Sequence, residues 1–237
     1  MGASFDILRK PWVPAVDAAG QTMELGLLET LERAHELQAI QTASPMEEYS
    51  VYRFLIVFLM DALRPEDGEE DIGGLLEAEQ FDMEAIQDYL TQCRKEGVSF
   101  DLFDAARPFL QTAYVEAWDR EAKPVSTLDY TIPNGNNHIH FDHRRNEISY
   151  TPGKALRMLL TAQNFCTAGA QGYPSNVNGA PPWFALIQGE NLFQTLVLGM
   201  IGTDEILLPF DEPPVLWRNK KEITAKQEVA KTSWLYG

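Results

Sequence analysis

The chain has 237 residues, 45% of them hydrophobic, and a formal net charge of −16. This length supports a sizeable core in one large or two small domains, and the negative charge argues against a protein that coats nucleic acid without selectivity. No run of about 18 apolar residues is present, so no segment is expected to span a membrane.

The beginning of the chain has neither a basic nor an apolar region of the kind found in secretory signals. The two cysteines, Cys93 and Cys166, lie in apolar segments with helical character, which is typical of reduced thiols in a packed interior. We therefore expect a cytoplasmic protein.

Turn residues and hydrophobic periodicity predict an α+β fold with mixed helices, short β-hairpins and small sheets. Ser44, Pro45 and Glu47 predict an N-cap, a proline at the first helical position and a capping-box glutamate, which together begin a long core helix. Asp82 and Thr151 are predicted to cap two later helices. The predicted elements are strands at 7–16 and 22–25, helices at 27–38, 45–63 and 83–95, helices at 154–166 and 192–200, and a strand at 183–188.

Three further segments are predicted to lack long regular elements. An acidic, glycine-bearing connection at 65–74 is expected to be exposed. Short extended pieces at 100–104 and 107–112 carry several phenylalanines, which we interpret mainly as core residues.

The charge is divided unevenly along the chain. Residues 1–123 carry 25 acidic and 10 basic side chains, whereas residues 124–237 carry 10 acidic and 9 basic ones. The second half can therefore make a short contact with nucleic acid, but it has too little positive charge to bind along a long stretch of duplex.

Two polar loops in the second half are candidate binding segments. The first, 132–145, lies in a stretch with three of the four histidines, two adjacent arginines and four asparagines, a density of donors and rings that a core does not need. The second, 168–181, has few large side chains, so its backbone N–H groups can approach a phosphate or a groove floor closely. The alternative is two ordinary surface loops.

One motif in the first loop raises a different chemistry. His138, His140, Asp142 and His143 match HxHxDH, a pattern that holds zinc in the metallo-β-lactamase superfamily, where a bound hydroxide hydrolyses the substrate. That superfamily needs further histidines downstream, and this chain has none after His143. A zinc-dependent hydrolase therefore remains the alternative function, and loss of bound zinc on replacing His138 and His140 with alanine would favour it.

Four separate stretches, taken in order and spacing, resemble one known family. They are 5–14, the pair 100–103 and 107–111, Gly135 to His143, and the helix that runs into the glycine-bearing loop. The chain is similar to the N-terminal half of CasA, the large subunit of the type I-E CRISPR Cascade complex. The resemblance implies one N-terminal-type domain over 1–237, with an acidic helical half (1–123), a nucleic-acid-facing half (124–237) and no C-terminal helical bundle.

The resemblance also implies a function and its residues. The first loop would dock against the 5′ handle of the guide RNA and a neighbouring subunit through Asn136, Asn137 and Phe141, with Phe141 stacking on a base. Gly169, Ala170, Gln171 and Gly172 would enter the minor groove beside the protospacer-adjacent motif, although Ala170 and Gln171 replace two of the usual glycines. The implied partners are other Cascade subunits, CRISPR RNA, double-stranded target DNA and a helicase-nuclease effector, and no catalytic residue, metal or cofactor is implied.

Overall fold

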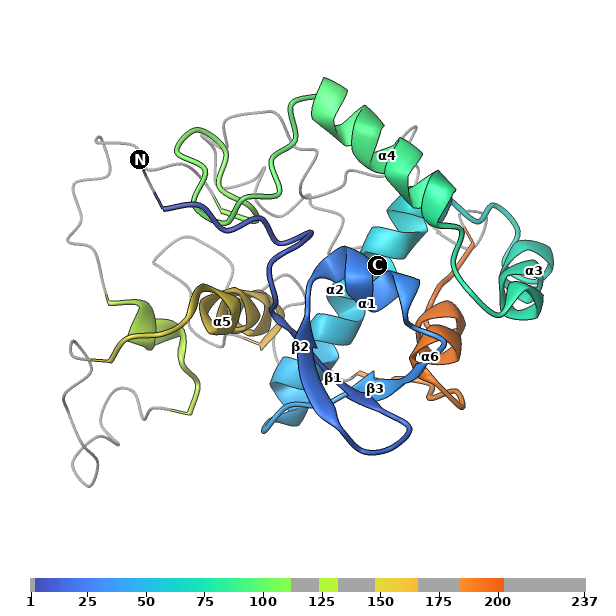
Figure 1. Cartoon of the computed structure of the whole chain (residues 1–237), viewed down its shortest axis with the longest axis horizontal. Coiled ribbons are helices and arrows are strands. Elements are labelled where there is room, and N and C mark those ends of the chain that lie inside the picture. Colours follow the sequence, from blue (N-terminus) through green and yellow to red (C-terminus); the bar gives the residue numbers. More distant parts are fainter. Residues whose placement is uncertain (1–2, 112–123, 132–147, 166–183, 203–237) are drawn as a thin grey trace.

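A computed structural model describes residues 3–111, 124–131, 148–165 and 184–202, which form a small sheet and several helices around one long central helix (Figure 1). The predicted α+β class is confirmed. Among the described helices, none combines the length and the apolar character needed to cross a bilayer. The elements are β1 (Val13–Asp17), β2 (Thr22–Leu25), α1 (Leu27–Glu32), β3 (Leu37–Ile40), α2 (Pro45–Leu63), α3 (Glu70–Ala78), α4 (Met83–Lys95), the 3-10 helix η1 (Val125–Leu128), α5 (Pro152–Phe165) and α6 (Leu192–Leu198).

The sheet is antiparallel, with the strand order β2-β1-β3. The predicted hairpin is confirmed, since β1 pairs with β2 so that Val13 faces Leu25, but its first strand begins at Val13 and the strand prediction is wrong for 7–12. Just before β1, the buried indole of Trp12 donates a hydrogen bond to the Ile7 carbonyl at 2.8 Å and meets the Phe54 ring edge-on. The sheet is thereby fixed to the central helix.

The helix predicted at 27–38 is wrong in its second half. Helix α1 ends at Glu32, and after a turn the chain forms β3, which pairs with the free side of β1 and places Ile40 opposite Ala15. Leu37 and Ile40 become buried by this pairing. The helical periodicity was a local signal, whereas strand pairing satisfies the backbone of β1 and buries both side chains.

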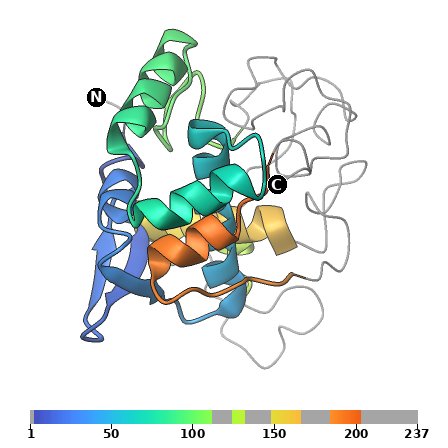
Figure 2. The same ribbon diagram turned by 90° about the vertical axis from the view of Figure 1, so that its right-hand side faces the viewer.

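Helix α2 forms the centre of the core, as predicted, and packs against α4, α5, α6 and β3 (Figures 1 and 2). Ser44 caps it by accepting a hydrogen bond from the Met46 N–H at 3.2 Å. Phe54 and Phe58 are fully buried, and each such side chain contributes about 1.5–3 kcal/mol through burial. The Tyr89 hydroxyl of α4 donates to the buried Asp61 carboxylate of α2, which adds a polar link between these helices.

Two predictions around α4 have different outcomes. Helix α4 begins after Asp82, whose carboxylate accepts from the N–H groups of Glu84 and Ala85, so the predicted cap is confirmed. The connection predicted at 65–74 is wrong in part, because helix α3 occupies 70–78. Three partly buried side chains of α3 pack on the core and outweigh the helix-weakening effect of its two glycines; they are Ile72, Leu75 and Leu76.

Later elements also differ from the predictions in detail. Phe100 and Phe109 are buried as expected, but Phe103 is 43% exposed. Helix α5 begins two residues before the predicted start, and Cys166 lies outside the described residues. The strand predicted at 183–188 is wrong for 184–188, which lie outside any strand.

Candidate nucleic-acid interface

The residues predicted to contact nucleic acid lie outside the described residues. This holds for Asn136, Asn137 and Phe141 of the first loop, for Gly169, Ala170, Gln171 and Gly172 of the second, and for His138, His140, Asp142 and His143 of the zinc motif. The structure does describe the chain on both sides of each loop. We call the residues that flank 132–147 the first stem and those that flank 166–183 the second stem.

The first stem is closed by side-chain hydrogen bonds. The Tyr150 hydroxyl donates to the Asp129 carboxylate at 2.9 Å, which joins the chain before the loop to the chain after it. The same carboxylate accepts from the Thr131 N–H at 3.0 Å. The two ends of the first loop are therefore held together.

Glu47 connects this stem to the central helix. Its carboxylate is 4% exposed and accepts from the Arg157 Nε at 2.7 Å and from the Lys154 ammonium, both on α5. The Tyr130 hydroxyl, on the other side of the loop, donates to the same carboxylate at 3.3 Å. One buried anion of α2 thus binds groups from both sides of the first loop.

The role of Glu47 differs from the predicted one. The Ser44 N–H donates to the Thr42 hydroxyl, so the capping-box bond from Glu47 is not formed. Arg157, only 11% exposed in its side chain, continues the network by donating to the Trp12 carbonyl at 2.7 Å. The ion pair of Glu47 and Arg157 therefore joins α2 and α5 to the residue just before the sheet.

The first stem depends on the ionised form of Asp129. Burial by itself would raise the pKa of Asp129, but hydrogen bonds from Thr131 and Tyr150 and the nearby Lys154 charge hold that pKa below its usual value of 3.8. Burial, together with the hydrogen bond and charge of Asp129, raises the pKa of Tyr150 to about 12. Tyr150 is therefore a neutral donor and Asp129 an ionised acceptor near neutral pH.

We expect the contribution of Asp129 to stability to disappear in acid. Because its pKa is lower in the folded state than in the unfolded state, the contribution is complete above the ordinary pKa and is lost as the pH falls through the folded-state pKa. The Tm difference between wild type and Asp129→Asn should therefore stay constant down to about pH 5 and shrink as the pH falls below about 4. A difference that stays constant below about pH 4 would contradict the stem role of the carboxylate.

The second stem is closed by aromatic packing. Phe165 ends α5 and Phe184 follows the loop, and their ring centroids lie 5.3 Å apart. Tyr49 of α2 stacks on Phe184 at 4.2 Å and meets Phe165 edge-on at 6.0 Å. The two ends of the second loop are therefore also held together on α2.

A buried cation strengthens this second stem. The Arg53 Nη1 donates to Asn164 Oδ1 at 3.1 Å, and its guanidinium carbon lies 5.5 Å from the centroid of the Phe184 ring. Burial lowers the pKa of Arg53, and the nearby Tyr49 acts in the opposite direction. Arg53 links the last turn of α5 to the residue that follows the loop.

Both stems are fixed to α2. Glu47 of the first stem and Tyr49 of the second lie in the same turn of α2, two residues apart, so their side chains point to different sides of the helix. Loops whose ends are fixed to a rigid element are presented at defined positions, which is how scaffolds commonly carry binding residues. The arrangement fixes the described ends of both loops to α2 and α5, the first loop before the start of α5 and the second after its end.

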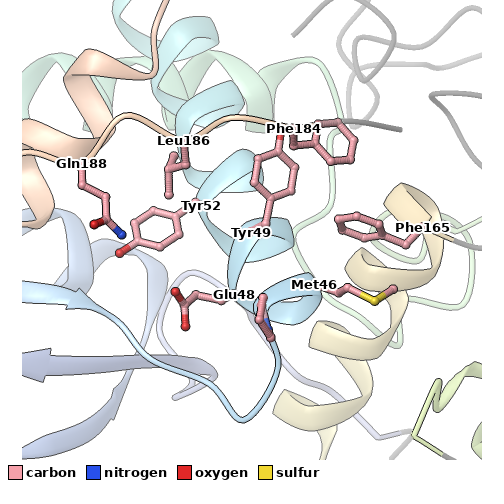
Figure 3. Close-up of a pocket in the computed structure, with 9 residues that line it drawn as sticks. Met46, Glu48, Tyr49, Tyr52, Phe165, Phe184, Leu186 and Gln188 are labelled. Carbon is pink, nitrogen blue, oxygen red and sulfur yellow. The ribbon is translucent and has the colours of Figure 1, made fainter. Parts of the chain in front are cut away.

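A cavity of about 400 Å³ adjoins the second stem (Figure 3). Tyr49, Phe165, Phe184 and Leu186 line it, and Glu48 lies at its side. Within the described ranges, no three histidine, cysteine, aspartate or glutamate side chains are close enough to hold a metal ion. The described part of the chain thus offers an aromatic surface rather than a metal centre.

Sequence reasoning did not identify Glu47, Arg157 or Tyr49 as parts of the candidate interface. Glu47 was interpreted only as a helix cap. The signal that could have indicated a further role is the pair Lys154 and Arg157, which places two cations on one face of a helix that otherwise has few charges.

Comparison with known proteins identifies relatives along nearly the whole chain. The family model of CRISPR-associated protein Cse1 matches residues 6–235. CRISPR-associated protein CasA/Cse1 of Thermus thermophilus is 32% identical over 97% of this chain and 45% of the relative. The chain therefore spans about half the length of that relative.

Solved structures have the same fold. The crystal structure of Thermus thermophilus CasA gives a TM-score of 0.69 at 29% identity, covering 90% of this chain and 42% of that one. Thermobifida fusca Cse1 gives a TM-score of 0.74 at 24% identity, with coverages of 98% and 46%. A chain of a CRISPR RNA-guided surveillance complex gives 0.74 at 20% identity, with coverages of 93% and 47%. At these last two identities the likeness concerns the fold alone.

Proposed function

Because the chain belongs to the Cse1 (CasA) family of CRISPR-associated proteins, we propose that it acts as a subunit of an RNA-guided surveillance complex. In this role it contacts the 5′ handle of the guide RNA and helps recognise the protospacer-adjacent motif of target DNA. It is a binding protein rather than an enzyme, and it acts in the cytoplasm. A solved surveillance complex that contains a chain of this fold supports the proposal.

The observation that carries the proposal is that the described ends of both loops are fixed to the same central helix, α2. Glu47 holds the ends of the first loop and Tyr49 those of the second. A guide RNA handle and a target duplex come close together where the protospacer-adjacent motif adjoins the paired segment. Two binding loops whose ends are fixed to α2 and α5 could contact these two ligands.

The first loop is proposed to contact RNA. Phe141 offers a ring on which a base can stack, and Asn136 and Asn137 offer amide donors and acceptors beside it. The loop also carries Arg144 and Arg145, whose charges favour a phosphate backbone. The acidic first half of the chain would repel nucleic acid elsewhere and so confine contacts to this region.

The second loop is proposed to contact the minor groove of the target duplex. Gly169 and Gly172 permit close approach of the backbone, and Gln171 can donate to the acceptors on the groove floor. Sequence selection beyond this short motif would come from pairing between guide and target. The remaining partners are then the other subunits and a helicase-nuclease recruited after target binding.

Replacing Phe141 with alanine is expected to weaken association with the guide-loaded complex by about 1–3 kcal/mol, the value of one base stacked on an aromatic ring. Titration of the complex lacking its large subunit with each variant measures this. Phe103→Ala serves as a control, because Phe103 is an exposed phenylalanine that lies outside the loop. Unchanged affinity for Phe141→Ala would remove the stacking role.

A further inference from the structure

In the segment 184–188, backbone N–H and C=O groups lack hydrogen-bond partners among the described residues. The segment runs past α2 between the second stem and α6 (Figure 3). Ala185, Leu186, Ile187 and Gln188 form no hydrogen bond with any part of the chain that the structure describes. A stretch of unpaired N–H and C=O groups at a surface is the template onto which another strand can pair.

The side chains of this segment alternate as those of a strand do. Phe184 and Leu186 are half-buried and face the cavity, whereas Ala185 and Ile187 are exposed, Ile187 by 60%. The same alternation led to the strand prediction for 183–188. The sequence therefore has the pattern of a paired strand, but the described residues supply no strand beside it.

The adjoining cavity has the chemistry of a site for a basic side chain. Tyr49 presents an aromatic ring, and the half-buried Glu48 lines the same cavity on the side of Tyr52 (Figure 3). Glu48 accepts a long hydrogen bond of 3.4 Å from the Thr42 N–H and makes no ion pair with any described residue. Aromatic faces and an uncompensated carboxylate together attract a lysine or arginine.

We propose that residues 184–188 receive an extended segment of a neighbouring protein subunit, which adds as a strand and inserts a basic side chain between Tyr49 and Glu48. Backbone hydrogen bonds would provide affinity, and the cavity would select the side chain. The inference rests on the proposed function, since it assumes that the chain is a subunit of a complex.

Charge favours a basic polypeptide over the alternatives. A nucleic-acid strand would bring phosphates towards Glu48, whose charge is not neutralised by any described residue. A second copy of this chain carries a net charge of −16 and would be repelled. A basic extended segment of a neighbouring subunit would pair with the unpaired backbone groups of 184–188 and would also neutralise the charge of Glu48.

Proline substitutions test the backbone contact directly. Proline removes an N–H group and is tolerated where that group is unpaired and the preceding residue is extended. Consecutive N–H groups of an extended segment point to opposite sides, so the N–H group of either Ile187 or Gln188 faces the added strand. We therefore expect one of the variants Ile187→Pro and Gln188→Pro to bind the guide-loaded complex lacking its large subunit about tenfold more weakly than wild type. Ile187→Val and Gln188→Thr keep the N–H groups and should bind as wild type does.

Glu48→Lys tests the cavity independently of the backbone. We expect binding about tenfold weaker than wild type, because the added cation repels the basic side chain. Glu84→Lys is the matched control, since both glutamates lie in the first turn of a helix, Glu84 in α4 and Glu48 in α2, but Glu84 is exposed and lines no part of the cavity. The Tm of each variant shows whether the fold is kept.

The outcomes separate this docking from the proposed function. Failure of the wild-type chain to bind the complex would remove the proposed function and the docking with it. Normal binding by wild type and by both proline variants would overturn the docking alone, as would normal binding by Glu48→Lys. Self-association of the wild-type chain that the proline variants abolish would assign the segment to a second copy and also overturn the proposal.

Discussion

Glu47→Gln is expected to lower the free energy of unfolding by about 3 kcal/mol, the lower end of the cost of breaking a buried ion pair. The substitution keeps the size of the side chain but removes the anion that Lys154 and Arg157 share, which leaves the 11% exposed Arg157 side chain with the more exposed Glu24 as its remaining carboxylate partner. In a chain of this length the loss corresponds to a fall in Tm of roughly 6–12 °C. Thermal unfolding followed by circular dichroism measures it.

Glu29→Gln is the control for this experiment. Glu29 pairs with Arg33 at the surface, where their side chains are 53% and 35% exposed and such a pair contributes little. The Tm of Glu29→Gln should therefore stay close to that of wild type. Equal Tm values for the two variants would contradict the central place of Glu47 in the first stem.

Gly169→Leu and Gly172→Leu are expected to weaken binding of the target duplex by the assembled complex about tenfold or more, since displacing the backbone from the groove removes contacts worth about 1–3 kcal/mol each. A minor groove about 6 Å wide admits backbone and small side chains but not a branched one. Assembly with the guide RNA should be unchanged. Duplex titration of complexes reconstituted with each variant tests this.

Backbone strain is the competing explanation for such an effect. A glycine at positive φ also resists substitution, and its loss lowers Tm. Gly74→Leu is the control, because a Cβ at Gly74 of α3 would meet no atom within 4 Å. Full duplex binding by both loop variants would refute the groove role, and equal losses of stability and binding would make the glycines structural.

The sequence predicted elements best where the signals were local. Ser44 and Asp82 cap α2 and α4 as expected, because an N-cap acts on N–H groups two or three residues away. The helix at 27–38 failed in its second half because β3 forms through pairing with β1, which no local periodicity encodes. The fold class could therefore be predicted, whereas the third strand could not.

The candidate interface shows the same limit. The two loops could be identified from their composition, but the groups that fix their ends depend on distant partners. Glu47 bonds with residues 107 and 110 positions later in the chain, and Tyr49 with rings on both sides of the second loop. The strand predicted at 183–188 has no partner among the described residues, and alternation alone does not make 184–188 a strand.

The central claim is that this chain joins a guide-loaded complex through the RNA handle and gives it affinity for a target duplex. The most direct measurement adds the purified chain to complexes that lack the large subunit and carry guides with or without the 5′ handle, and then titrates each with target duplex. Our account predicts that the chain binds only the complex with the handle and increases its affinity for the duplex. Equal binding to both complexes, or no increase in duplex affinity, would contradict it.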